Sequence, residues 1–259
     1  MSVELHYELD GPEGAPVLML SNSLGTALHM WEDQMPALTE HFRLVRYDQR
    51  GHGRSPAPPG PYSIEELAGD ALALLDRIDV ERVSFCGASM GGMTGMWIAI
   101  NSPGRIDRLG LCCTSAHIPP RERWLERAAL VRGRKGMESV VEASLERWFT
   151  PAFRGRKPET AERLERGLRE IDPEGYAACC EALAETDLRA QLATIKAPTL
   201  VITGEDDLST PPDHGRLIAE QVENGTCLML SPARHLANVE RPEEVNHALV
   251  EHLLAAEPT

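Results

Sequence analysis

Short, uninterrupted runs of apolar residues, separated by segments with helical spacing, limit most strongly how this chain can fold. The runs cover residues 17–20, 44–47, 83–86, 109–113, 198–203 and 226–230. A strand buried on both faces, as in a parallel sheet between two layers of helices, has this continuous apolar character. The alternation of strand and helix patterns therefore predicts an α/β fold with a mostly parallel, doubly wound sheet.

Three of the expected helices have clear signals. Ser63 can cap a helix that carries glutamates in its first turn and an apolar stripe at three- and four-residue spacing. Residues 89–101 are mostly apolar and contain three glycines, which suits a helix packed closely against a sheet. Residues 242–254 are expected to form an amphipathic helix at the C-terminus.

The pattern changes between residues 118 and 186. Strand-like runs disappear there, and arginine and glutamate become frequent. We predict a helical cap over residues 118–186, inserted into a core formed by residues 1–117 and 187–259. In the first part of this cap the helical stripe that we expect to face inward consists of Leu125, Ala128, Ala129 and Arg132.

Composition excludes several classes of function. The 259 residues carry a net charge of −14, which argues against binding to nucleic acid or to an anionic membrane. No run is long and apolar enough to span a bilayer, and the first residues lack the pattern of a secretory signal. We therefore expect a cytoplasmic protein whose six cysteines are reduced thiols, with no metal site.

The strongest chemical signal is the sequence Gly-Ala-Ser-Met-Gly-Gly at residues 87–92, between an expected strand and an expected helix. In this context a G-x-S-x-G sequence is typical of a nucleophile elbow, a sharp turn that exposes a serine above the sheet. Small residues are required on both sides because the turn is tight. Ser89 is therefore the candidate nucleophile.

A nucleophilic serine needs a base, and the base needs an acid that orients it. Among nine histidines we favour His235, because it follows the last expected strand, where open α/β sheets place their sites. The acid should follow the preceding strand, where residues 205–207 are all acidic. We favour Asp207, with Asp206 as the alternative; the order serine, aspartate, histidine is that of the nucleophile-elbow hydrolases.

Two backbone N–H groups are expected to form the oxyanion hole. One is that of Met90, directly after the serine. The other should come from the loop after the strand at residues 17–20, where we favour Leu24 over Ser23. Each such donor contributes about 10²- to 10³-fold to the rate.

Residues 48–55, Asp-Gln-Arg-Gly-His-Gly-Arg-Ser, match the structural turn D-x-R-G-x-G-x-S of the α/β-hydrolase family, which the chain resembles over nearly its whole length. In residues 22–26, 85–95, 147–150 and 175–182 it resembles more closely the 3-oxoadipate enol-lactonases of the β-ketoadipate pathway in aromatic catabolism. The resemblance implies an α/β-hydrolase fold and a serine hydrolase that opens an anionic enol-lactone without a metal or organic cofactor.

An anionic substrate in an acidic protein needs a local cation. Among Arg127, Arg132 and Arg134 in the expected cap we favour Arg132, because it lies on the inward stripe. Trp124 and Trp148 are further candidates for substrate contact, although packing between cap and core is the commoner role for such residues.

Other functions remain open at this stage. The same fold and residues would suit a general carboxylesterase or lactonase, a carbon–carbon bond hydrolase or a perhydrolase. Serine at position 89 argues against a haloalkane dehalogenase, for which aspartate would be expected there. A different class would be a ligand-binding homologue without catalysis, although such a protein would not need all three catalytic residues in order. The sequence does not predict an oligomeric state.

Overall fold

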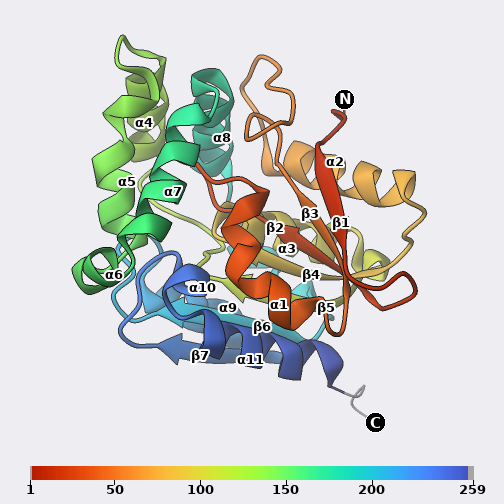
Figure 1. The fold of residues 1–259 in the computed structure, drawn as a ribbon. Coiled ribbons are helices and arrows are strands. Elements are labelled where there is room, and N and C mark those ends of the chain that lie inside the picture. The colour runs from red at the N-terminus through yellow and green to blue at the C-terminus, as the bar shows by residue number, and fades with distance from the viewer. Residues whose placement is uncertain (1, 256–259) are drawn as a thin grey trace.

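A single sheet of seven strands organises the part of the chain that the computed structural model describes, residues 2–255 (Figure 1). In chain order the strands are β1 (Tyr7–Asp10), β2 (Val17–Ser21), β3 (Arg43–Tyr47), β4 (Val83–Ala88), β5 (Ile106–Cys112), β6 (Thr199–Gly204) and β7 (Gly225–Leu230). Their order across the sheet is β1-β3-β2-β4-β5-β6-β7, and all pairings except β1 with β3 are parallel. The predicted mostly parallel sheet is confirmed.

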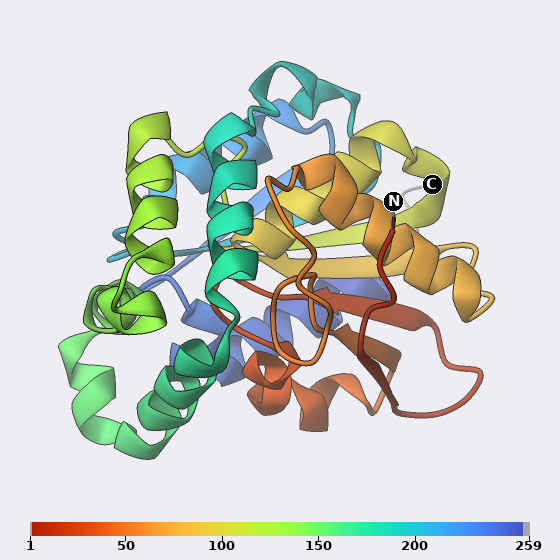
Figure 2. The same cartoon turned by 90° about the horizontal axis from the view of Figure 1, so that it is seen from above.

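Helices cover both faces of the sheet, as Figure 2 shows from above. On one face lie α1 (Met35–Leu38) and α11 (Pro242–Leu254), and on the other α2 (Ile64–Arg77), α3 (Met90–Asn101) and α9 (Pro212–Gln221). The predicted N-terminal capping of α2 by Ser63 is present. The Glu66 N–H donates to Ser63 Oγ, and the Glu66 carboxylate accepts from the Ser63 N–H. The strands β2 and β4 are almost entirely buried, which explains their continuous apolar sequences.

Five α-helices lie between β5 and β6 and gather on one side of the molecule (Figures 1 and 2). They are α4 (Arg121–Arg132), α5 (Val141–Trp148), α6 (Pro151–Arg156), α7 (Pro158–Glu170) and α8 (Pro173–Glu185). Strands are absent from this described segment, as expected for a helical insertion. The division into a cap at 118–186 and a core at 1–117 and 187–259 stays a prediction.

The first strand is not predicted by the sequence analysis. Its four residues are mostly polar, and none of them is fully buried. Besides its backbone pairing with β3, β1 is held by charge: Arg46 donates to Glu8 at 2.7 Å and to Asp10 at 2.9 Å. An edge strand of this kind has no apolar run that could reveal it.

Three further properties bear on where and how the chain works. Within residues 2–255 no helix has the length and apolar character needed to cross a membrane. The cysteines are free, five of them buried and Cys227 exposed. No group of three or more His, Cys, Asp or Glu in the described part of the chain could hold a metal ion. The cytoplasmic location stays a prediction.

Candidate active site

Ser89 occupies the sharp turn between β4 and α3. Its backbone has φ 52° and ψ −114°, a conformation that residues other than glycine rarely adopt. The Ser89 N–H donates to Cys112 O on the neighbouring strand, and Thr114 Oγ1 donates to Ser89 O. These bonds hold the strained residue in place at the carboxyl end of the sheet.

The glycines around Ser89 are required by close backbone approach. A Cβ atom on Gly87 would lie 2.2 Å from Gly91 O, and one on Gly91 would lie 2.3 Å from Ser21 O. Both obstacles are backbone atoms, which cannot rotate away. The spacing G-x-S-x-G thus reflects the packing of the turn against itself and against β2.

We expect Gly87→Ala to destabilise the protein by about 1–3 kcal/mol, because the added methyl group overpacks a buried turn. Gly69→Ala is the matched control: a Cβ there meets nothing within 4 Å, and alanine should stabilise α2 by about 0.5–1 kcal/mol. Thermal unfolding of the two variants checks both signs. Equal melting temperatures would contradict this account of the turn.

The structure brings Ser89, His235 and Asp207 together in one chain of hydrogen bonds. Ser89 Oγ lies 2.9 Å from His235 Nε2, and His235 Nδ1 lies 2.8 Å from Asp207 Oδ2. Asp207 follows β6 and His235 follows β7, as the sequence analysis predicted. A serine hydroxyl in this arrangement can pass its proton to the imidazole, whose positive charge the carboxylate then stabilises.

Asp207 is held as an oriented anion. Burial alone would raise its pKa, but the charge and hydrogen bond of His235 and the N–H groups of Thr210 and Ser209 together lower the pKa of this carboxyl. Thr210 Oγ1 adds a fourth donor at 2.8 Å. The alternative acid, Asp206, is exposed.

Two backbone N–H groups near Ser89 are available for an oxyanion. In the described part of the chain, neither the Leu24 N–H nor the Met90 N–H donates to a protein group. The neighbours of Leu24 are occupied: the Ser23 N–H donates to Met30 Sδ at 3.4 Å, and the Gly25 N–H donates to His52 Nε2 at 2.9 Å. This pattern favours Leu24 over Ser23 as the second donor.

His52 supports this loop from the D-x-R-G-x-G-x-S turn. Burial lowers the pKa of His52 to about 4, although the carbonyl of Arg50 opposes the shift. At neutral pH the ring is therefore uncharged, and its Nε2 can accept the Gly25 N–H. The motif thus has a structural role here: it fixes the chain next to Leu24.

A small cavity lies above Ser89, between the sheet and the helices α4, α5 and α8. With room for about 20 Å³ it holds little more than one water molecule, so a substrate needs some side chains to shift. Both predicted tryptophans, Trp124 and Trp148, contribute to its lining. The polar lining residues are Ser23, Ser89, Arg127, Ser144, Arg147, Tyr176, Ser209 and His235.

Two lining arginines lack a carboxylate partner in the described part of the chain. Arg147 donates to Ser144 Oγ at 3.1 Å, and the Arg127 guanidinium lies 5.4 Å from the centroid of the Trp124 ring. Burial, together with the positive charges of Arg127 and Arg123, lowers the pKa of Arg147 to about 10. Arg147 is therefore still a cation at neutral pH, and the cavity carries positive charge that no carboxylate of the described residues compensates.

The predicted site residue Arg132 does not lie at this cavity. Its guanidinium donates to the carboxylates of Glu174 and Glu181, and it lines a different, open surface hollow. The reason is the orientation of α4, whose buried residues are Trp124, Ala128 and Val131. The inward face is therefore shifted by one residue from the predicted stripe. Arg147 was missed, although it directly precedes Trp148 in one of the family-like segments.

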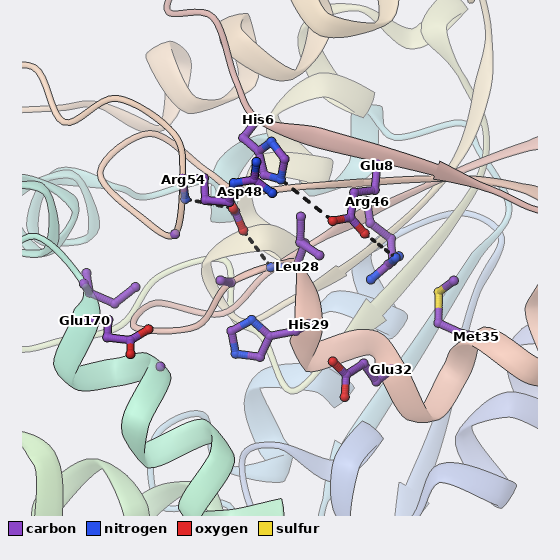
Figure 3. Close-up of a pocket in the computed structure, with 14 residues that line it drawn as sticks. His6, Glu8, Leu28, His29, Glu32, Met35, Arg46, Asp48, Arg54 and Glu170 are labelled. Atoms are coloured by element: carbon purple, nitrogen blue, oxygen red, sulfur yellow. Dashed lines mark hydrogen bonds and ion pairs between the residues drawn. The ribbon is translucent and has the colours of Figure 1, made fainter.

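A second cavity, of about 490 Å³, has Ala27 and Leu28 among its lining residues (Figure 3). Figure 3 shows acidic and basic side chains around it, including Glu170 from α7 and His29 and Glu32 from the 3₁₀ helix Leu28–Gln34. None of the predicted site residues lines this cavity. The size of a cavity alone does not identify an active site. The smaller cavity is the candidate active site because Ser89 and His235 line it.

The fold is that of the α/β hydrolases. A model of the α/β hydrolase fold family matches residues 16–242, and the chain belongs to the α/β-hydrolase family. It is 42% identical to 3-oxoadipate enol-lactonase 2 of Acinetobacter baylyi, over 95% of this chain and 92% of that protein. The resemblance predicted from the sequence is confirmed, as is the class of enzyme, a hydrolase of ester bonds.

Solved structures agree with this assignment. The enol-lactonase from Burkholderia xenovorans LB400 is 44% identical, with a TM-score of 0.95 over 98% of this chain and 97% of that one. A thermophilic esterase from Thermogutta terrifontis is 30% identical, with a TM-score of 0.91 over 97% of this chain and 93% of that one. The fold is thus shared by proteins named as an enol-lactonase and as an esterase.

Proposed function

We propose that this protein hydrolyses 3-oxoadipate enol-lactone to 3-oxoadipate, through an acyl-enzyme on Ser89. The observation that carries the proposal is a hydrogen-bonded serine, histidine and aspartate beside a cavity whose two arginines have no carboxylate partner in the part of the chain that the structure describes. The similarity to proteins named enol-lactonase over nearly the whole chain supports the choice of lactone.

In the first half of the reaction Ser89 Oγ attacks the ring carbonyl carbon, and its proton passes to His235 Nε2. Formation of the new C–O bond produces a tetrahedral intermediate, whose oxyanion accepts hydrogen bonds from the N–H groups of Leu24 and Met90. When the intermediate collapses, the ring C–O bond breaks and the enol oxygen takes the proton from His235. An enol is more acidic than an alcohol, so this oxygen leaves more readily than an alkoxide would. The released enol then becomes the ketone by losing its O–H proton and gaining one on carbon.

In the second half His235 removes a proton from water, whose oxygen attacks the acyl carbon of the ester on Ser89. Collapse of this second intermediate returns the proton to Ser89 Oγ and releases the product. The product has one carboxylate more than the lactone. Asp207 stabilises the imidazolium in both halves without taking up a proton.

The carboxylate that the lactone already carries needs a cation, and Arg127 and Arg147 are the cap residues that we assign to it. Several surface arginines of the cap are paired with glutamates, as in the pairs Arg121–Glu185, Arg132–Glu174, Arg154–Glu142 and Arg169–Glu138. The cavity arginines are partly buried and have no carboxylate partner within residues 2–255, which is costly unless a ligand compensates the charge. The surrounding protein is acidic, so this charge is a local property of the cavity.

The decisive experiment compares the enol-lactone, generated in the assay, with a panel of neutral p-nitrophenyl esters. We expect kcat/KM to be much higher for the charged lactone than for any neutral ester of similar size. Equal or higher values for the neutral esters would instead identify a general carboxylesterase, and no turnover of either would favour a non-catalytic homologue. Labelling of Ser89 by a fluorophosphonate tests the nucleophile independently of the substrate.

We expect Arg147→Gln to lower kcat/KM for the charged lactone by about 10- to 100-fold, because charged hydrogen bonds to the substrate are lost. Hydrolysis of a neutral ester should change little. Arg132→Gln is the matched control, since that side chain is paired with glutamates away from the cavity. If Arg147→Gln lowered both activities equally, Arg147 would not recognise the carboxylate.

A further inference from the structure

The loop that carries His235 is bonded directly to the cap segment that carries Arg147. The His235 N–H donates to Arg147 O at 3.3 Å, and the Leu236 N–H donates to Trp148 O at 3.1 Å. The Arg234 guanidinium adds a bond to Phe149 O at 3.3 Å. Successive backbone hydrogen bonds thus join the loop of His235 to the cap segment that lines one side of the cavity.

A buried carboxylate, that of Glu240, binds to both segments. Glu240, in α10 (Ala237–Glu240), accepts the Thr150 N–H at 3.0 Å and the Thr150 hydroxyl at 2.7 Å. The same side chain accepts the Arg234 N–H at 3.0 Å. Glu240 is only 5% exposed, so these three donors replace the water that the carboxylate has lost.

We propose that Glu240 is a positioning residue that ties the cap segment 147–150 to the catalytic loop 234–236, so that Arg147 and His235 keep a fixed relative position. The two ends of its clamp are Thr150, three residues after Arg147, and Arg234, one residue before His235. Glu240 itself lines no part of the cavity above Ser89 and is not assigned any contact with substrate.

This arrangement also indicates which side of the cap must yield to admit a substrate. The cavity is nearly filled, and the wall formed by α5 is bonded to the catalytic loop. The rest of the cap lining is formed by Trp124 and Arg127 of α4 and Tyr176 of α8. The helix α8 also packs closely on the core, where Gly175 meets Gly51. Opening is therefore expected at α4, while Arg147 stays in register with His235.

The first test measures how fast Ser89 reacts with a neutral fluorophosphonate, a step that needs His235 in place but no substrate carboxylate. We expect Glu240→Ala to slow labelling between about 10- and 100-fold, as misplacement of a reacting group does. Glu240→Gln should label at close to the wild-type rate, because its carbonyl oxygen can still accept both N–H groups and its amide can donate to Thr150. Labelling of Glu240→Ala at the wild-type rate would overturn the proposal.

Loss of stability alone must be separated from misplacement. Ile106→Ala is the control: Ile106 is also buried, but it begins β5 at the amino ends of the parallel strands, away from the catalytic loop, so its truncation lowers stability without altering the site. At a temperature where both variants are folded, Ile106→Ala should keep the labelling rate. A comparable slowing in Ile106→Ala would overturn the proposal. If Glu240→Ala does not fold, Glu240→Asp, which retracts the carboxylate, takes its place under the same criterion.

The second test addresses the link to substrate recognition, which rests on the proposed function. Glu240→Ala should reduce the preference for the charged lactone over a neutral ester, and the double variant with Arg147→Gln should show non-additive effects. Additive effects on this preference would overturn the coupling to Arg147. If the wild-type protein did not hydrolyse the lactone, the proposed function would fail, whereas the labelling test would still decide the role of Glu240.

Discussion

Ser89→Ala is expected to lower kcat for enol-lactone hydrolysis by about 10⁴- to 10⁶-fold, the largest effect of any single substitution considered. The variant loses the atom that forms the acyl-enzyme, while the donors at Leu24 and Met90 and the cavity arginines remain. Some rate above that in water should therefore persist, because binding and oxyanion stabilisation do not depend on the hydroxyl. The measurement is single-substrate kinetics on the lactone, with the uncatalysed rate subtracted.

Binding and catalysis should separate in this variant. The product or an unreactive analogue should bind Ser89→Ala with nearly unchanged affinity, and fluorophosphonate labelling should disappear. Ser84→Ala is a suitable control. Ser84 is buried on β4, the strand that leads to Ser89, and in the described part of the chain its side chain has no hydrogen bond to His235. Retention of full lactonase activity by a clean Ser89→Ala preparation would exclude the proposed mechanism.

The parts of this fold that depend on local chemistry could be predicted from the sequence. Strands β2 and β4 are buried on both faces, so nearly every residue in them is apolar or small. Ser89, Asp207 and His235 each follow a strand, and the carboxyl ends of parallel strands meet at one edge of the sheet. Their meeting could thus be predicted without any knowledge of distances.

Helix orientation in the cap could not be predicted in the same way. In α4 several overlapping sets of residues satisfy helical spacing, and one residue of rotation, about 100°, decides between them. The predicted set ended at Arg132, whereas Val131 is buried and Arg132 is paired with glutamates at the surface. What selects the face is the packing of α4 against α8, a contact between segments far apart in the sequence.

Contacts over long sequence separations also explain why supporting residues were missed. Glu240 lies 90 residues from Thr150, and nothing in the residues around it distinguishes it from a solvated glutamate. His52 lies 27 residues from Gly25, and the motif that contains it predicts a turn but not the acceptor that it provides. Such roles depend on which surfaces meet, which the local sequence does not determine.

Asp207→Asn should have the second largest effect, a loss of about 10⁴-fold in kcat with little change in overall stability. The carboxylate accepts a hydrogen bond from the N–H group at His235 Nδ1, so Nε2 carries no proton and can accept the proton of Ser89. An amide whose NH₂ group faces Nδ1 would instead favour the tautomer with the proton on Nε2. In that form the imidazole cannot act as a base toward the serine.

The neighbouring carboxylate provides the control for this prediction. Asp206→Asn removes the same charge one residue away, but Asp206 is exposed and has no side-chain bond to His235. Its kcat should therefore stay within about twofold of the wild type, as for most surface substitutions. Steady-state kinetics of both variants, with thermal unfolding to check their integrity, decide between the two acids. A large loss in Asp206→Asn and a small one in Asp207→Asn would reverse the assignment and show that the hydrogen bond to Nδ1 does not set the tautomer.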